Sequence, residues 1–485
     1  MSQASRSIAA RPLATLLGDW RSGQPSPAYA ALARALSVLV LDGRLPLNCR
    51  LPSERDLAAA LELSRTTVTA GYDTLRAAGF LVSRRGSGSW TALPPRQTMP
   101  ATGGFAPAVA VGAPDDLIDL ASAAPAAPAD TVLTATRHAL DDLPRHLDDD
   151  GYDPVGLLPL RAAVAERYAR RGLPTTPDQI MVTSGALHAL DLVLRLLAGP
   201  GDRVLTDAPT YPTALDAMRG AGARLVPVGL TGAGWNVDML TAALRQTAPR
   251  LGYLIADFHN PTGHVMTDEE RAAVVAAAGR AGTTLVVDES FVELAYDDEP
   301  LPAPVGSYDR DGRVITVGSL SKPFWGGLRV GWVRAGADLV RRLAEARAAA
   351  DMASPVLEQL VAIRLLEMAD EVLPARRRLF AERRDALAAA LHRELPQWRF
   401  RLPRGGLALW VELDAPVSTA LAVVAGQHGV RLAAGPRFGL DGTPERFLRL
   451  PFTQPPELLD AAAVRLAAAR ARIAGAPAAP PLVVA

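Results

Sequence analysis

The spacing of apolar residues along the first ninety positions predicts three helices. From Ala28 the apolar side chains fall on one helical stripe, and this pattern breaks at Asp42-Gly43. A second helix is expected to open at Pro52–Leu57 with Ser53 as its N-cap, because serine is a preferred N-cap residue, and a third is expected to open at Ser64–Val68. Only residues 62–63 separate these two helices, a spacing typical of a helix-turn-helix.

A pair of short strands is expected after the third helix. The segment Phe80–Trp90 places apolar residues on both sides of Gly86-Ser87-Gly88, and glycine-rich turns of this kind join antiparallel strands. Arg84 and Arg85 precede the turn. We interpret the hairpin as a wing that lies on a phosphate backbone, beside a helix that presents its first side chains to the major groove.

Farther along the chain, helical stretches alternate with short apolar runs at 180–182, 203–206, 251–255, 284–288 and 314–317. Strands that alternate with helices predict a largely parallel α/β sheet. Ligands of such sheets bind at the carboxyl ends of the strands. The polar residues that follow several of these runs are therefore candidates for a binding site.

Two stretches without periodicity divide the chain. Residues 93–116 are rich in Pro, Ala and Gly, and are expected to form a flexible linker that can span some tens of ångströms. The Pro- and Ala-rich residues 474–485 are expected to form a flexible tail. The domains expected on either side of the linker are a DNA-binding winged helix-turn-helix over 1–92 and an α/β domain over 117–473.

The composition excludes several classes of protein. With 485 residues, 49% of them hydrophobic, the chain can bury two or three cores, so it is not a disordered or fibrous protein. The single cysteine, Cys49, excludes an intramolecular disulfide and, without nearby Cys or His ligands, argues against a structural zinc. With no signal-peptide core and no apolar run of membrane-spanning length, a soluble cytoplasmic protein is expected.

Charge is unevenly distributed along the chain. The whole sequence is neutral, but residues 1–98 hold 12 Arg against 6 Asp and Glu, which leaves the remainder with a charge of −6. A basic small domain attached to a mildly acidic large one predicts a polyanionic partner for the small domain alone.

One position holds an amine where the rest of the chain uses guanidinium groups. Lys322 is the single lysine among 51 basic residues, and it lies in the serine- and glycine-rich run Gly318–Gly331. Arginine serves the other ion-pair roles, so this position is expected to need an amine that can lose its proton and attack a carbonyl. The pattern predicts a Schiff base at Lys322; the alternative is that a biased composition left one lysine by chance.

Polar residues at the ends of the apolar runs point to the same chemistry. Thr183–His188 begins a helix, whose first backbone N–H groups predict a phosphate site. Tyr211 can stack on a flat heterocycle or pack within its own loop. Asn260 lies in a tight turn that would hold its amide rigidly. Asp288 ends a strand, where its carboxylate can keep a pyridine nitrogen protonated, the charge that makes pyridoxal phosphate (PLP) an electron sink.

Residues 28–92 resemble the winged-helix head of GntR-type bacterial regulators. The resemblance rests on Leu-Pro-Ser-x-Arg at 51–55, Ser-Arg-Thr-x-Val at 64–68 and the glycine-rich wing. It implies double-stranded operator DNA as partner, with contacts from Arg55, Ser64, Arg65, Thr66, Thr67, Arg84, Arg85, Gly86 and Gly88. Thr69 stands where some relatives carry another arginine, which leaves base readout from that turn open. A protein-interaction module with a solvated basic face is the alternative.

Residues 28–470 as a whole resemble the MocR branch of that family, in which the head is fused to a domain like the aminotransferases of fold type I. The resemblance implies pyridoxal 5'-phosphate as cofactor, a mainly parallel sheet and a smaller C-terminal α/β subdomain. It implies Lys322 as the internal aldimine, Asp288 on the pyridine nitrogen, Asn260 on the phenolic oxygen and Tyr211 stacked on the ring. The residues implied around the phosphate are Ser184, Gly185, Ala186, Leu187, Ser319, Ser321 and Arg329.

The same resemblance assigns two residues outside this set. Tyr152 matches a tyrosine that reaches the phosphate of the neighbouring subunit, which implies a homodimer. Arg449 matches an arginine that pairs bidentately with the carboxylate of a substrate or effector; a surface arginine on a strand is the alternative.

Two departures concern the phenolic oxygen of the cofactor. Ser290 stands where aminotransferases and most MocR proteins have a tyrosine that touches this oxygen. Conversely, Asn260 is present where many MocR proteins have an aromatic residue.

Three functions are consistent with these features. The leading hypothesis is a transcriptional regulator that senses PLP itself, or a small amine or amino acid, through Lys322. The second is an aminotransferase with an attached DNA-binding head. The third is a constitutive DNA-binding protein in which the large domain serves as a dimerisation scaffold.

Overall fold

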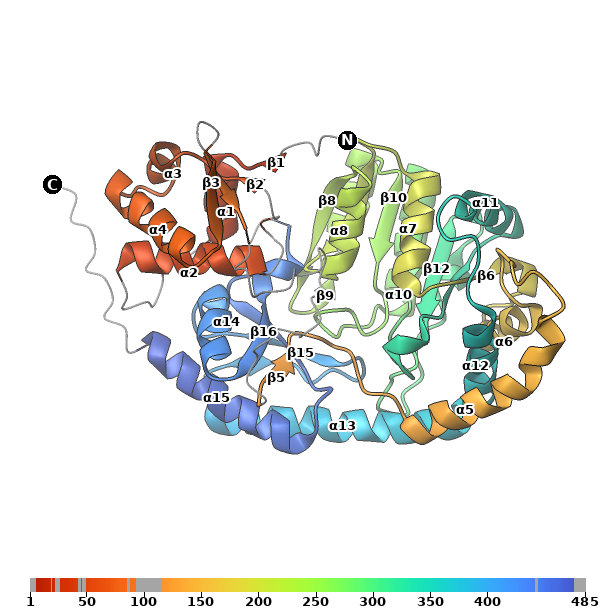
Figure 1. Ribbon diagram of the computed structural model, residues 1–485. Helices are drawn as coiled ribbons and strands as arrows, with labels where there is room; N and C mark the ends of the chain where they lie inside the picture. The colour runs from red at the N-terminus through yellow and green to blue at the C-terminus, as the bar shows by residue number, and fades with distance from the viewer. Residues whose placement is uncertain are drawn as a thin grey trace. The chain divides into compact units, whose positions relative to one another are not determined.

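The computed structural model describes residues 6–18, 20–21, 27–41, 45, 49–84, 88–92, 116–440 and 444–474 (Figure 1). The chain divides into two compact units. One comprises Met1–Ser122, Asp385–Arg401 and Leu409–Ala485, and the other comprises Ala123–Arg384 and Leu402–Ala408. The expected linker, apart from residue 116, and the expected tail, apart from residue 474, lie outside the described residues.

The head contains the three predicted helices and the predicted hairpin: α2 (Ala28–Leu41), α3 (Glu54–Ala60), α4 (Arg65–Ala77), β3 (Leu81–Arg84) and β4 (Gly88–Thr91). The predicted N-cap is confirmed, since the side chain of Ser53 accepts from the backbone N–H of Asp56. Ser64 caps α4 in the same way, accepting from the backbone N–H of Thr67. The predicted two-residue turn is too short. Helix α3 already ends at Ala60, so Leu61–Ser64 separates it from α4.

Three elements of the head were not predicted: β1 (Arg6–Ser7), α1 (Ala10–Leu17) and β2 (Cys49–Arg50). The strands form a four-stranded sheet in the order β1-β2-β4-β3. Leu13 and Leu17, one helical turn apart, bury the inner side of α1 in the core of the head. Cys49 is buried in the same core, where it packs as a small apolar residue.

The predicted parallel sheet is present in the second unit. Its eight strands are, in spatial order, β6 (Ile180–Thr183), β13 (Gly331–Arg334), β12 (Val314–Ser319), β11 (Thr284–Asp288), β10 (Leu251–Leu254), β7 (Arg203–Ala208), β8 (Arg224–Thr231) and β9 (Gly234–Trp235). Strands β13 and β9 run antiparallel to their neighbours, and the other six are parallel to one another. The expectation of a mainly parallel sheet is therefore confirmed.

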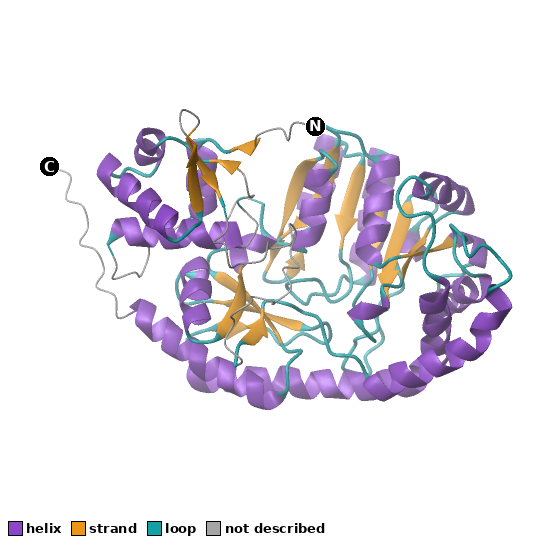
Figure 2. Cartoon of the chain, viewed as in Figure 1, coloured by secondary structure: helices purple, strands orange, loops and turns teal. Residues whose placement is uncertain are grey.

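Helices cover this sheet, whose strands lie between them in Figure 2. They are α5 (Ala129–Asp142), α6 (Leu158–Arg170), α7 (Ala186–Leu197), α8 (Pro212–Gly220), α9 (Val237–Thr247), α10 (Asp268–Ala281), α11 (Ala337–Arg347), α12 (Val356–Glu367) and the first part of α13 (Ala369–Glu394). Strand residues such as Leu205, Leu254 and Val287 pack against Leu240 and Val274 of the helices. At the other end of the sheet, Ile180 and Val182 of β6 pack with Leu360 and Leu365 of α12 in a second cluster.

A smaller α/β layer belongs to the first unit. Its five strands, in spatial order, are β14 (Arg399–Phe400), β15 (Ala408–Glu412), β17 (Phe447–Pro451), β16 (Val430–Ala434) and β5 (Ile118–Leu120), accompanied by α14 (Ser418–Gln427) and α15 (Pro456–Ala474). The expected C-terminal α/β subdomain is thus confirmed. Among the helices in the described part of the chain, none is long and apolar enough to cross a bilayer.

Candidate functional site

Lys322 lies just beyond the carboxyl end of β12 and is partly buried. Its Nζ donates a hydrogen bond to the carbonyl oxygen of Ala123 at 2.9 Å and lies 5.7 Å from the centroid of the Phe291 ring. Neither neighbour was predicted from the sequence. The single lysine is therefore held by contacts that include a backbone oxygen and an aromatic face.

Asp288 is the last residue of β11 and is 8% exposed. One carboxylate oxygen accepts from the hydroxyl of Tyr253 at 2.9 Å, and the other accepts from the backbone N–H of Ser290 at 2.9 Å. Burial raises the pKa of Tyr253, and the neighbouring Asp288 raises it further, so this phenol stays protonated and donates. The pair presents a fixed acceptor to any protonated ring nitrogen placed beside it.

The turn that carries Asn260 is stabilised by the buried side chain of its neighbour His259. The imidazole of His259 is fully buried; its Nδ1 lies 2.9 Å from the hydroxyl of Thr262, and its Nε2 lies 3.4 Å from the carboxylate of Asp207. Asp207 also accepts from the indole N–H of Trp235 at 2.9 Å. The bond between His259 and Thr262 closes the turn, and its burial against Asp207 and Trp235 fixes the backbone position of Asn260.

Asn260 and the neighbours of Lys322 line one small cavity. Its walls include Ala123, Phe258, Asn260, Phe291 and the segment 405–408. Gly405 is required there, because a Cβ at this position would lie 2.4 Å from the Phe258 ring. The structure therefore brings together the amine, the amide and an apolar wall, which in the sequence are spread over almost three hundred positions.

The start of α7 provides open backbone donors. Gly185 precedes the helix with φ +100°, a conformation that favours glycine, and makes no side-chain cap, so the first N–H groups of Ala186 and Leu187 face outward. A Cβ on Gly185 would lie 3.0 Å from a guanidinium nitrogen of Arg329, which donates to the carbonyl of Ser184. Backbone donors beside an arginine suit a phosphate.

The serines of β12 lie at the same edge. Ser319 pairs in register with Gly331 of β13, which pairs in turn with Thr183 at the end of β6. The hydroxyl of Ser319 donates to that of Ser321 at 2.7 Å. The residues predicted to hold the phosphate thus converge from three adjacent strand ends.

A carboxylate that sequence reasoning missed also reaches this edge. The hydroxyl of Ser184 lies 3.5 Å from Asp351, and the backbone N–H of Ser184 donates to Nδ1 of His188 at 3.0 Å. Asp351 is neutralised by the fully buried Arg347, whose Nε donates to it at 2.7 Å. Burial lowers the pKa of His188, which keeps its Nδ1 available as an acceptor.

The two predicted tyrosines, Tyr211 and Tyr152, differ in solvent exposure. Tyr211 is partly buried at the start of α8 and is close enough to Tyr253 to contribute to the raised pKa of that residue. Tyr152 is 62% exposed, with its backbone N–H bonded to Asp150. Within this single chain, Tyr152 is a surface residue.

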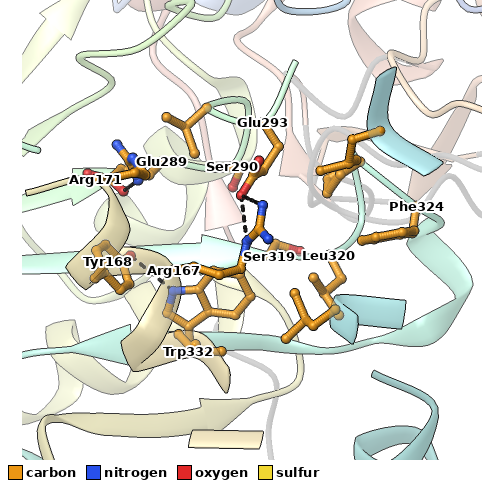
Figure 3. Close-up of a pocket in the computed structure, with 15 residues that line it drawn as sticks. Arg167, Tyr168, Arg171, Glu289, Ser290, Glu293, Ser319, Leu320, Phe324 and Trp332 are labelled. Carbon is orange, nitrogen blue, oxygen red and sulfur yellow. Dashed lines mark hydrogen bonds and ion pairs between the residues drawn. The ribbon is translucent and has the colours of Figure 1, made fainter. Parts of the chain in front are cut away.

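Ser290 lies in a separate cavity, shown in Figure 3. Ser290 and Ser319 line it together with two ion pairs, Arg167–Glu293 and Arg171–Glu289. The next residue, Phe291, is the one whose ring lies beside the amine of Lys322. The aromatic residue beside Lys322 is therefore Phe291, which has no hydroxyl.

Arg449 is on β17 and is 6% exposed. Its guanidinium donates to the carbonyl oxygen of Ala121 and lies 4.9 Å from the centroid of the Phe438 ring. This burial rules out the alternative of a surface arginine.

The first turn of α4 presents polar groups to solvent. The hydroxyl of Ser64 lies 2.8 Å from that of Thr66 and 2.7 Å from that of Thr67. The three hydroxyl groups predicted to contact DNA therefore form one hydrogen-bonded cluster. Arg55 and Arg65 are exposed, and neither forms an ion pair within the described residues. In the wing, Gly88 has φ +95°. Arg85, Gly86 and the side chain of Arg84 lie outside the described residues.

The donor set at the sheet edge fits PLP. Lys322 supplies an amine, Asp288 a buried carboxylate held by two donors, and the start of α7 with Arg329 a set of donors for an anion. Residues 115–466 match the family model described as aminotransferase class I and II. Residues 28–90 match the family model described as bacterial regulatory proteins, gntR family. The two family models cover separate parts of the chain.

Individual relatives combine the same parts. The chain is 30% identical to the uncharacterized HTH-type transcriptional regulator YdcR of Escherichia coli, over 87% of this chain and 94% of that protein. It is also 30% identical to the probable rhizopine catabolism regulatory protein MocR of Rhizobium meliloti, over 77% and 78% of the two chains. Among solved structures, the α-aminoadipate aminotransferase LysN of Thermus thermophilus, complexed with N-(5'-phosphopyridoxyl)-L-leucine, matches with a TM-score of 0.68 and 30% identity over 74% of this chain and 93% of that one.

Proposed function

This chain belongs to the MocR branch of the GntR family, whose members join a winged-helix head to a class I and II aminotransferase domain, and on that premise we propose that it is a transcriptional regulator that senses PLP or an amino compound at Lys322. The head would read operator DNA, and the large domain would report the state of the cofactor site. A regulator of chromosomal DNA acts in the bacterial cytoplasm, which is where the proposal places the protein.

The observation that carries the proposal is the position of the single lysine. Lys322 lies between the carbonyl oxygen of Ala123 and the ring of Phe291, at the same sheet edge as the carboxylate of Asp288. PLP, when bound, supplies an aldehyde that condenses with an amine and a ring that withdraws electrons. Asp288 would hold the ring nitrogen protonated, Asn260 would donate to the phenolic oxygen, and Tyr211 would stack on the ring.

The phosphate of the cofactor would be bound by the N–H groups at the start of α7, with Ser184, Ser319, Ser321 and Arg329 around them. Tyr152, exposed on the single chain, would reach the phosphate of a second subunit in a homodimer. Arg449, buried and stacked on Phe438, would bind the carboxylate of an amino acid effector. Ser290, whose backbone N–H donates to the carboxylate of Asp288, would lie beside the cofactor without a phenol to offer its oxygen.

Regulation requires that the effector bind one conformation of the dimer better than the other, because equal affinity shifts no equilibrium. An amine that displaces Lys322 from the cofactor would release the lysine ammonium toward Ala123 and Phe291. The linker at 93–116 would let the two heads of the dimer respond to that change. In the head, Arg55, Arg65 and the hydroxyl cluster at Ser64 would contact DNA, with Arg84, Arg85, Gly86 and Gly88 of the wing on its backbone.

The test combines a spectrum with a binding measurement. The purified protein is titrated with PLP while visible absorbance is recorded, and its affinity for the DNA upstream of its own gene is measured before and after. A Schiff-base band together with altered DNA affinity is expected. Affinity that stays the same with and without cofactor, and with each amine added, would refute the sensing role.

The second candidate, an aminotransferase with a regulatory head, is favoured by the presence of Asn260 in the same cavity as the neighbours of Lys322. It predicts turnover by alternate reaction with an amino acid and a keto acid at ordinary enzymatic rates. A Schiff-base band, turnover at such rates and no DNA binding would place this function first.

A further inference from the structure

Four arginines gather at the amino ends of the strands, the edge of the sheet opposite Lys322. Arg203 and Arg224 are the first residues of β7 and β8 and pair with each other in register. Arg250 directly precedes β10, and its backbone N–H donates to the carbonyl of Arg203 at 2.8 Å. Arg313 directly precedes β12. The first three line an open depression, which we call the arginine basin, together with Asp202 and residues 248–249 and 281–282.

The positive charges of this group are not balanced by acidic partners. Among the described residues, no carboxylate lies within ion-pair distance of Arg203, Arg224, Arg250 or Arg313, and these four lie together at one end of the sheet. The acid in the basin, Asp202, accepts a hydrogen bond from the backbone N–H of Gly199 at 2.8 Å. The basin therefore carries a net positive charge.

Helix capping explains the position of these side chains only in part. Arg203 donates to the carbonyl of Thr247 at 3.0 Å, and Arg250 donates to that of Leu197 at 2.9 Å; both acceptors are the last residues of helices. Cations are favoured at helix C-termini. However, each of these guanidinium groups uses one N–H in this way and keeps the others for an outside acceptor. The guanidinium group of Arg224 makes no hydrogen bond among the described residues, although its backbone N–H donates to the carbonyl oxygen of Asp202 at 2.8 Å.

The spacing of the group suits a row of phosphates. Neighbouring strands lie about 4.8 Å apart, so the arginines from β8 across to β12 extend over roughly 19 Å. One strand of duplex DNA presents a phosphate about every 3.4 Å along the helix axis, so this length faces roughly five of them. An open depression with polar walls fits an extended backbone better than a small anion, which needs a closed set of donors.

We infer that the arginine basin binds the phosphate backbone of duplex DNA, in addition to the DNA read by the head. The inference rests on the proposed function, because the head holds the chain on DNA and so raises the local concentration of phosphates near the basin. Contacts of this kind carry no base information. They would lengthen the bound DNA segment and increase the salt dependence of binding.

The experiment compares two duplexes with the full-length, PLP-loaded protein. The short duplex carries only the segment that the head protects in a footprint, and the long duplex carries the same segment with extended flanks. Affinity is measured by fluorescence anisotropy over a range of potassium chloride concentrations. For the unmodified protein we expect a steeper dependence of log affinity on log salt with the long duplex, by about 2 to 3 in slope for three phosphate contacts.

The variant is the triple substitution Arg203→Gln, Arg224→Gln and Arg250→Gln. It is expected to lose the extra slope and roughly tenfold or more of the low-salt affinity for the long duplex, and to bind the short duplex as before. The matched control, Arg170→Gln, Arg195→Gln and Arg341→Gln, removes the same charge from exposed arginines that are paired with acids. The control should bind both duplexes as the unmodified protein does.

Equal slopes for the two duplexes, or equal losses in the basin variant and the control, would overturn the inference. If the triple variant loses the Lys322 absorbance band or melts early, the single variant Arg224→Gln replaces it, since that side chain has no bond to lose; it should reduce the slope by about 0.9. Failure of the unmodified protein to bind the short duplex would instead count against the head. Dependence of long-duplex binding on the basin would still support the inference in that case.

Discussion

Replacing Tyr253 by phenylalanine tests how the site holds its carboxylate. The substitution removes one oxygen, which donates to Asp288 at 2.9 Å, and leaves the ring in place. Both residues are buried, at 1% and 8% exposure, so water does not readily replace the lost donor. A hydrogen bond to a charged group contributes about 1.5–3 kcal/mol.

Asp288 would keep the backbone N–H of Ser290 as its remaining protein donor. If the full contribution of the lost bond appears in cofactor binding, the apparent Kd for PLP rises roughly 10- to 100-fold, since about 1.4 kcal/mol corresponds to a factor of ten. The assay is an absorbance titration of the protein with PLP, accompanied by denaturant unfolding of the same samples.

The matched control is Tyr168→Phe. The Tyr168 hydroxyl is also buried, but its partner is the neutral indole N–H of Trp332 at 3.0 Å, on the wall of the cavity in Figure 3. This variant should lose about 0.5–1.5 kcal/mol of stability and bind PLP as before. An unchanged Kd for Tyr253→Phe, or equal changes in both variants, would refute the idea that this phenol supports Asp288.

Four further predictions follow from the same geometry. Lys322→Ala should abolish the visible Schiff-base band but leave salt-dependent DNA affinity; a retained band would show that another amine carries the cofactor. Arg65→Ala should weaken operator binding without changing the cofactor spectrum, and a normal footprint would displace α4 as the recognition helix. Because burial lowers the pKa of His188 below its ordinary value of about 6.5, the neutral ring that accepts from Ser184 is fully present above that pH and is lost as the pH falls through the lowered pKa. PLP retention followed by equilibrium dialysis should therefore decline in acid, and a profile that stays flat down to the pH of unfolding would contradict this. Arg347→Met should cost about 2–5 kcal/mol in denaturant unfolding, because it leaves the backbone carbonyls of Pro154 and Val182 without their buried donor, and a loss below 1 kcal/mol would argue against that role.

Much of the fold could be predicted because it is encoded locally. The helix stripe from Ala28, the caps at Ser53 and Ser64 and the apolar runs that became β7, β10, β11 and β12 depend on neighbours a few positions apart. Lys322 stood out for a compositional reason that needs no structure at all. Helix α1 was missed, although Leu13 and Leu17 have helical spacing, because two apolar positions in a short segment are a weak signal.

The sequence by itself thus determined the order of the domains, the type of sheet and which single amine the proposal depends on. Only the tertiary structure decided what surrounds that amine. Ala123 lies 199 positions from Lys322, and Tyr253 meets Asp288 because β10 and β11 are adjacent, a pairing that crossover connections hide from any local pattern. The direction of side chains just after a strand, which put Phe291 rather than Ser290 at the lysine, also depends on how the turn packs. The arginine basin has the same origin, since parallel strands bring their amino ends together from distant parts of the chain.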